Sequence, residues 1–179
     1  ILQKNFEHIF ENNPLVCAFG EDVGKIGGVN QTMEGLQEKY GDLRIFDTGI
    51  REATILGQGL GIAVGVAIAA RKIEKLSYRT WCVLGDSEMA EGSVYEAMAV
   101  AAQESLDNLI AIIDINKLGQ RGETALGHDI SKYRARVEAF GWHAIEVDGH
   151  CVESINDALA AAISHTGSPV AILAKTEKG

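Results

Sequence analysis

The chain is built around two apolar runs, Trp81-Cys-Val-Leu-Gly-Asp-Ser87 and Leu109-Ile-Ala-Ile-Ile-Asp-Ile-Asn116. Each run has the length of a buried strand and leads into an oxygen-bearing side chain, Asp86 in the first and Asn116 in the second. One amphipathic segment of crossover-helix length separates them, so the pattern predicts a right-handed β-α-β unit with parallel strands. Asp86 and Asn116 would then meet at the carboxyl edge of the sheet, where open α/β folds bind their ligands.

The chemistry of these two side chains indicates a hard cation. One carboxylate and one carboxamide leave further coordination positions for phosphate oxygens, which describes Mg²⁺ better than Zn²⁺ with its preference for His and Cys. Gly85 lets the backbone approach a ligand closely. Asp and Asn are also common turn and cap residues. Asp86 and Asn116 lie thirty residues apart at the ends of two matching strands, which favours a ligand site over an ordinary turn or cap.

The rest of the chain alternates apolar runs with helical segments. We expect strands at 15–19, 44–48, 80–84, 109–115, 142–148 and 169–175, and helices at 1–13, 32–40, 53–71, 92–104, 129–139 and 151–165. This alternation predicts an α/β fold, a single doubly wound domain over residues 1–179, whose mostly parallel sheet of about six strands has helices on both faces. The glycines of helix 53–71 weaken it by up to about 1 kcal/mol each, so we expect close packing against a strand, a partner helix or a cofactor.

Composition excludes several classes of function. The chain has 179 residues, of which 46% are hydrophobic and 23% charged, enough for one globular domain with a core. A net charge of −9 with scattered Lys and Arg argues against nucleic-acid binding. No signal peptide or apolar run of about 20 residues is present, so no membrane partner is expected. The three cysteines lack metal-ligand spacing, which favours a reducing, cytoplasmic location. Because the chain starts at Ile1 and stops just after a strand, we expect a fragment of a longer protein.

The pair Gly85-Asp86 with Asn116 is similar to the thiamine diphosphate motif, in which Gly-Asp-Gly is followed at a comparable distance by Asn. Residues 56–179 resemble the N-terminal, diphosphate-binding domain of transketolase. Ser87 departs from the motif, which usually has Gly there. The stretches that carry the resemblance are Leu56-Gly-Gln-Gly-Leu60, Gly85–Ala99, Leu106-Asp-Asn-Leu109, Asp114–Gln120, Phe140-Gly-Trp-His143, Val147-Asp-Gly-His150 and Ala174-Lys-Thr176.

This resemblance implies a site for thiamine diphosphate with Mg²⁺ or Ca²⁺. Asp86, the side-chain oxygen of Asn116 and the main-chain carbonyl of Leu118 would ligate the metal. The two neighbours of Asp86 would lie against the diphosphate, and Gln120 would approach the cofactor ring. The implied reaction transfers a two-carbon ketol unit between sugar phosphates. The implied cofactor contacts are Gly85, Asp86, Ser87, Asn116, Leu118 and Gln120.

Residues 1 to about 60 resemble a different family, the β chain of the decarboxylating component of 2-oxo acid dehydrogenase complexes. The two resemblances meet near Gly57-Gln-Gly59. We therefore interpret the chain as a chimera, in which a pyrimidine-domain-like segment (1–58) joins a transketolase-like segment (59–179); a natural relative that diverged toward both families is the alternative. The stretches that carry the second resemblance are Phe19-Gly-Glu-Asp-Val-Gly24, Gly27-Gly-Val29, Gly35–Gly41 and Arg44-Ile-Phe-Asp-Thr48.

Two glutamates are candidate catalytic residues by resemblance. Glu52 matches the glutamate that hydrogen-bonds the aminopyrimidine ring and promotes its imino tautomer, a role that needs a raised pKa. Glu91 matches a transketolase glutamate in the polar network between the two cofactor sites of a dimer. Either could instead be a carboxylate at a helix N-terminus, stabilised by the helix dipole.

Three functions stay open on the sequence: a transketolase-type transferase, a 2-oxo acid decarboxylating component, and a non-catalytic scaffold. The His-Ala and Gly-His-Pro segments that precede Leu-Gly-Gln-Gly in transketolases are absent, so turnover by this chain in isolation is open. In both families the active site lies between two kinds of domain. We therefore expect a homodimer, or pairing with a complementary pyrimidine-binding domain.

Overall fold

The computed structural model describes residues 2–28, 31–48, 52–119 and 122–177, without the side chains of residues 2, 21, 48 and 52–58. The chain divides into two compact units, Ile1–Ile55 and Leu56–Gly179. The single domain expected over residues 1–179, with a join near residue 58, stays a prediction.

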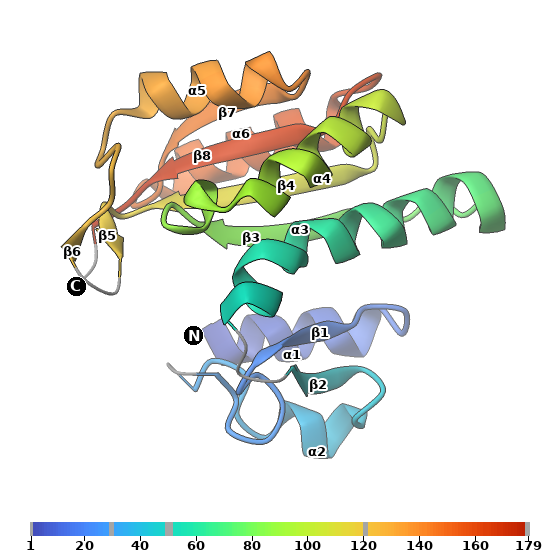
Figure 1. The fold of residues 1–179 in the computed structure, drawn as a ribbon. Coiled ribbons are helices and arrows are strands. Elements are labelled where there is room, and N and C mark those ends of the chain that lie inside the picture. Colours follow the sequence, from blue (N-terminus) through green and yellow to red (C-terminus); the bar gives the residue numbers. More distant parts are fainter. Residues whose placement is uncertain (1, 29–30, 49–51, 120–121, 178–179) are drawn as a thin grey trace. The chain divides into compact units, whose positions relative to one another are not determined.

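The first unit contains two helices and two parallel strands (Figure 1). Strands β1 (Ala18–Glu21) and β2 (Ile45–Thr48) pair in parallel, with Ala18 opposite Ile45. Helix α1 (Leu2–Asn12) supplies the buried Phe10, and α2 (Leu36–Tyr40) supplies the buried Leu36 to a small core around Ile45. Helix α2 is shorter than predicted because Gly35 has a φ of 76°, a left-handed conformation that starts the helix late.

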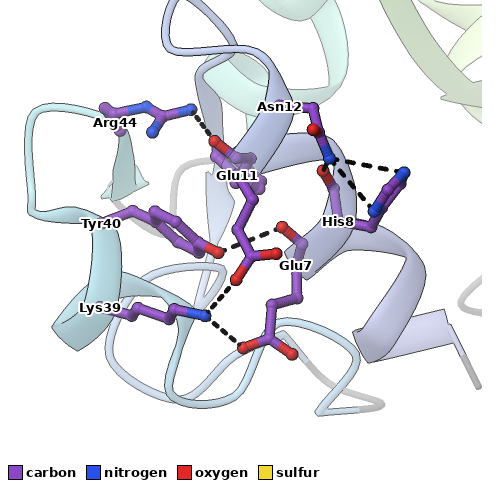
Figure 2. A network of polar contacts seen from close by, with 8 residues as sticks. Glu7, His8, Glu11, Asn12, Lys39, Tyr40 and Arg44 are labelled. Atoms are coloured by element: carbon purple, nitrogen blue, oxygen red, sulfur yellow. Dashed lines mark hydrogen bonds and ion pairs between the residues drawn. The ribbon is translucent and has the colours of Figure 1, made fainter.

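Arg44 connects helix α1 to the start of strand β2, in the network that Figure 2 shows. Its guanidinium donates to the carbonyls of Val16 at 3.1 Å, Phe10 at 3.0 Å and Asn13 at 2.7 Å. It also lies over the rings of Phe10 and Tyr40, 5.0 and 5.3 Å from their centroids. The last carbonyls of a helix have no partner within it, so this cation satisfies one of them, that of Phe10, together with two carbonyls that follow α1.

The second unit is organised around four parallel strands in the order β3-β4-β8-β7. Strand β4 has the bounds that its apolar run predicts. Two helices, α3 and α4, lead into and out of β3, and α3 continues into a short π-helix, Ala69–Glu74. The elements are α3 (Glu52–Ile68), β3 (Thr80–Gly85), α4 (Gly92–Gln103), β4 (Leu109–Ile115), α5 (Ile130–Ala139), β7 (His143–Asp148), α6 (Val152–Ser164) and β8 (Val170–Lys175).

Helices cover both faces of this sheet, as the alternating pattern predicts (Figure 1). Helices α3, α4 and α5 bury residues such as Leu60, Met98 and Val137 against one face. On the other face α6 packs Ala158 and Ala162 in a second core. Burial on both faces explains why the strands read as nearly continuous apolar runs. No helix in the described part of the chain is long and apolar enough to span a membrane.

The expectation of about six strands in one sheet is wrong for the described residues. All six expected strands form, but the larger sheet holds four, and β1 and β2 make a separate two-stranded sheet in the first unit. A hairpin of two very short antiparallel strands, β5 (Leu118–Gly119) and β6 (Gly122–Glu123), was not predicted. Apolar periodicity reveals that a segment is a strand, but which strands share hydrogen bonds depends on how the elements pack.

The expected close packing of the α3 glycines is found only in part. A Cβ added at Gly59 would lie 4.0 Å from Cys82 Sγ, whereas at Gly61 and Gly65 it would meet no described atom within 4 Å. The neighbouring Ile62 and Val66 are 44% and 39% exposed. One apolar side of α3 is therefore left uncovered by the described residues of the second unit.

Candidate functional site

Parallel pairing of β3 and β4 brings Asp86 and Asn116 to the same edge of the sheet, as predicted. Gly85 lies opposite Asp114, and the Asp86 N–H extends the ladder by donating to the Asp114 carbonyl at 3.0 Å. Asp86 is 4% exposed and, among the described residues, is the only polar or charged residue that is buried. Burying an unpaired carboxylate costs free energy, so this position calls for a compensating cation or donor.

One donor comes from a residue that sequence reasoning missed. The Thr124 hydroxyl donates to Asp86 Oδ2 at 2.9 Å, and the Thr124 N–H donates to the Lys117 carbonyl at 2.8 Å. Thr124 follows strand β6 and lies 38 residues beyond Asp86. The β5–β6 hairpin, which was not predicted, brings Thr124 to Asp86. No local sequence pattern indicates this contact.

Asn116 is held in a network of its own. Its Nδ2 donates to Asp114 Oδ2 at 3.0 Å, and the Thr176 hydroxyl donates to Asp114 Oδ1. Its Oδ1, the predicted ligand atom, accepts the Leu118 N–H at 3.0 Å. Lys117 between them has a φ of 60°, a left-handed conformation that turns the chain and keeps the Leu118 N–H beside Asn116 Oδ1. A carboxamide oxygen has two lone pairs, so one remains for a cation.

The residues that flank Asp86 leave room for a ligand. Ser87 is exposed, and a Cβ added at Gly85 would make only ordinary contacts, 3.7 Å from Ser87 Oγ. The Glu88 carboxylate accepts the Gly85 N–H, and burial raises the pKa of Glu88 to about 7. Glu88 was not selected from the sequence, although it stands three residues after Gly85. Its raised pKa is a property of the burial that folding imposes.

A cavity of about 220 Å³ opens beside Asp86. It is smaller than the roughly 300–1,000 Å³ of pockets that enclose a drug-sized ligand, so this unit alone does not surround a whole cofactor. Burial raises the pKa of the Tyr133 phenol in its wall, and the charge of Asp86 adds to this effect. The lining residues are Asp86, Ser87, Met89, Ala90, Thr124, Ala125, Leu126, Tyr133 and Arg136.

The other predicted site residues are only partly placed by the structure. Glu91 is exposed and occupies the N-cap position of α4, without a side-chain capping bond. Glu52 is the first residue of α3, but its side chain lies outside the described residues, as does Gln120 as a whole. Within the described ranges, no three His, Cys, Asp or Glu side chains form a cluster able to hold a metal. A cation here would therefore need carbonyl, carboxamide and ligand oxygens, a donor set that fits Mg²⁺ or Ca²⁺.

Comparison with known proteins points to one family. Residues 45–179 match the family described as the thiamine diphosphate binding domain of transketolase. Human transketolase is 55% identical over 124 residues, which is 69% of this chain and 19% of that protein. Human transketolase-like protein 2 is 48% identical over 171 residues, 93% of this chain and 27% of that protein. The latter match necessarily extends into the first unit.

Solved structures agree with these relatives. Transketolase from Campylobacter jejuni has a TM-score of 0.61 and 36% identity, with 67% of this chain and 20% of that chain covered. Transketolase from Pichia stipitis in complex with sedoheptulose-7-phosphate has a TM-score of 0.57 and 30% identity, with 72% and 20% covered. The chain thus spans about a fifth of the length of most of these relatives. A match over most of its length, at this identity, shows that the chain belongs to the transketolase family, as a thiamine diphosphate-binding domain.

Proposed function

We propose that the carboxyl edge of β3 and β4 binds thiamine diphosphate together with Mg²⁺ or Ca²⁺. The observation that carries this proposal is Asp86, a buried carboxylate next to Asn116 on the neighbouring strand. A divalent cation would offset the cost of burying that charge. Membership of a thiamine diphosphate-binding family supplies the cofactor whose phosphate oxygens would complete the coordination.

Most of the proposed contacts lie at or just after the carboxyl ends of β3 and β4. Asp86, Asn116 Oδ1 and the Leu118 carbonyl would hold the metal, with Asn116 and Leu118 kept together by the turn at Lys117. Gly85 and the exposed Ser87 would lie against the diphosphate. Gln120 is proposed near the ring on the resemblance alone.

The reaction that we propose is transfer of a two-carbon ketol unit between sugar phosphates. Thiamine diphosphate supplies stabilisation of a carbanion when it is bound. The transketolase relatives support this reaction class, and the Pichia stipitis protein binds a sugar phosphate. Glu52 would hydrogen-bond the aminopyrimidine and Glu91 would connect two cofactor sites. The small cavity beside Asp86 indicates that another domain must complete the active site, so activity in isolation stays open.

The alternative functions have less support. The hypothesis of 2-oxo acid decarboxylation rested on the resemblance of the first 60 residues. The match to the transketolase family, however, begins at residue 45, and a transketolase-like protein aligns over 93% of the chain. The chimeric origin of residues 1–58 stays a prediction. A non-catalytic scaffold is separated from a transferase by assay, because ketose phosphate turnover above background excludes it.

A homodimer, or pairing with a complementary pyrimidine-binding domain, is proposed through helix α3. Gly61 and Gly65 have open space where a side chain would be, and Ile62 and Val66 expose apolar surface beside them. Small and apolar residues spaced four apart on one helix side allow close approach of another helix. Three free cysteines fit a reducing, cytoplasmic location. Light scattering at micromolar concentration tests the dimer, and a monomer would contradict it.

Calorimetric titration of the full chain with thiamine diphosphate, with and without Mg²⁺, tests the binding proposal. We expect binding that depends on Mg²⁺ and is lost in Asp86→Ala. Asp157→Ala, an exposed substitution on α6, is the matched control and should bind as the parent does. Absence of metal-dependent binding in the parent chain would refute the proposal.

A further inference from the structure

Thr124 makes contacts that link the two proposed metal-ligand segments. Its hydroxyl donates to Asp86 Oδ2 at 2.9 Å, and its N–H donates to the Lys117 carbonyl at 2.8 Å, next to Leu118. We propose that Thr124 is a positioning residue, which orients the Asp86 carboxylate for the cation and holds the Leu118 loop at the correct distance from it. This inference rests on the proposed metal site.

The first part of the argument concerns the orientation of the carboxylate. The hydroxyl of Thr124 binds Oδ2, while Oδ1 makes no hydrogen bond with the described residues. A donor on one oxygen fixes the side-chain rotation and leaves the other oxygen for a metal. Hydrogen-bond partners of this kind orient the ligands of a metal site, and losing one typically weakens metal affinity about 10- to 100-fold.

The second part concerns the loop that carries the remaining ligands. Asn116 Oδ1 accepts the Leu118 N–H, and Leu118 pairs with Glu123 in the β5–β6 hairpin, directly before Thr124. The bond from the Thr124 N–H to Lys117 closes this loop. Thr124 is therefore bonded through its backbone to one ligand segment and through its side chain to the other.

The shape of Thr124 is used as well as its hydroxyl. A Cβ added at Gly119 would lie 3.7 Å from the Thr124 methyl and 3.8 Å from Ser87 Cβ, so the hairpin backbone packs between these two residues. The methyl thus faces the hairpin while the hydroxyl faces Asp86. Valine would preserve the packing and remove the donor, whereas serine would preserve the donor and remove the methyl.

These two substitutions separate a positioning role from a packing role. We would titrate Mg²⁺ by calorimetry into parent, Thr124→Val and Thr124→Ser chains saturated with thiamine diphosphate. Thr124→Val should weaken Mg²⁺ affinity about 10- to 100-fold, and Thr124→Ser should stay close to the parent. A variant that is only less stable, but still folded, would keep the affinity of the parent, because ligand affinity reports the folded state.

Thr80→Val is a matched control at the start of β3, the strand that leads to Asp86. The Thr80 hydroxyl is buried without a hydrogen-bond partner among the described residues, so its removal should leave Mg²⁺ affinity unchanged. Metal-free circular dichroism and thermal unfolding would verify that each variant is folded. If Thr124→Val does not fold, Thr124→Ala compared with Thr124→Ser tests the donor, because both lack the methyl and only serine keeps the hydroxyl; equal affinity of the two would overturn the positioning role.

The outcomes distinguish this inference from the proposal beneath it. A parent chain without Mg²⁺-dependent binding overturns both. A parent that binds, with Thr124→Val equal to it, overturns the positioning role alone. Loss of affinity in the serine variant but not in the valine variant would assign the effect to packing of the hairpin and would also overturn the role of the hydroxyl.

Discussion

Replacing Arg44 by Met should unfold the first unit preferentially. The guanidinium donates three hydrogen bonds to carbonyls at 2.7–3.1 Å and lies over the rings of Phe10 and Tyr40. Met preserves most of the apolar stem but none of the donors. The Phe10 carbonyl in the last turn of α1, and the Asn13 and Val16 carbonyls beyond it, would then lose their charged donor.

The size of the effect follows from these contacts. A hydrogen bond from a charged donor contributes about 1.5–3 kcal/mol, and a cation–π contact at an exposed site about 0.5–1 kcal/mol. Water would replace part of the lost hydrogen bonding in the variant, because Arg44 is only half-buried. We therefore expect a loss of about 2–4 kcal/mol. Domains have about 0.05–0.15 kcal/mol of stability per residue, so this is a large share for a unit of this size.

Hydrogen–deuterium exchange on the full chain measures this loss in each unit. Peptides from α1, β1 and β2 should lose protection in Arg44→Met, while those from β4 and β8 should keep it. Lys39→Met is the matched control, because Lys39 forms exposed ion pairs with Glu7 and Glu11 (Figure 2) and a cation–π contact with Tyr40 at 5.2 Å, but among the described residues its side chain donates to no backbone carbonyl of α1. Equal exchange in the two variants would refute the assigned role of Arg44. Equal loss of protection in both units would show that they unfold together, as the predicted single domain requires.

Three further predictions concern the second unit. Burial and the charge of the stacked His165 lower the pKa of His143. The unfolded chain therefore binds more protons, and the free energy of unfolding should fall as pH drops below the ordinary histidine value of about 6.5. Urea midpoints should depend less on pH in His165→Gln, and an unchanged pH dependence would argue against this cause. Burial raises the pKa of the Cys82 thiol to about 12, so an alkylating reagent at neutral pH should modify the exposed Cys17 first, and equal rates by peptide mass spectrometry would contradict it. Trp142→Phe removes a buried indole N–H bond of 2.9 Å to a carbonyl of α4 and should cost about 1–3 kcal/mol in urea denaturation, which a neutral result would exclude.

Most of the second unit could be predicted from residue order alone. The run Leu109–Ile115 was expected as a strand and has those bounds in the structure. Its neighbours on both faces are helices, so nearly every residue is apolar, and this leaves a strong signal in the sequence. Asp86 and Asn116 were placed at one sheet edge by the same logic, because parallel strands end together.

Other features could not be predicted because they depend on contacts distant in sequence. Strands β5 and β6 have two residues each, too few for any periodicity. Thr124 meets Asp86 across 38 residues, and its importance exists only after that hairpin folds back. The pKa of Glu88 depends on burial, which the identity of a residue does not reveal.

The order of residues along this chain was therefore sufficient for the longer strands and helices of the second unit and for the two strand ends at which a cation would bind. Apolar periodicity is a local property, and a helix between two strands favours their parallel pairing. The division of the six expected strands between two sheets, and the hydroxyl that reaches the buried Asp86, came from packing between segments far apart. Such packing depends on which surfaces fit together in three dimensions, and a linear pattern does not contain that information.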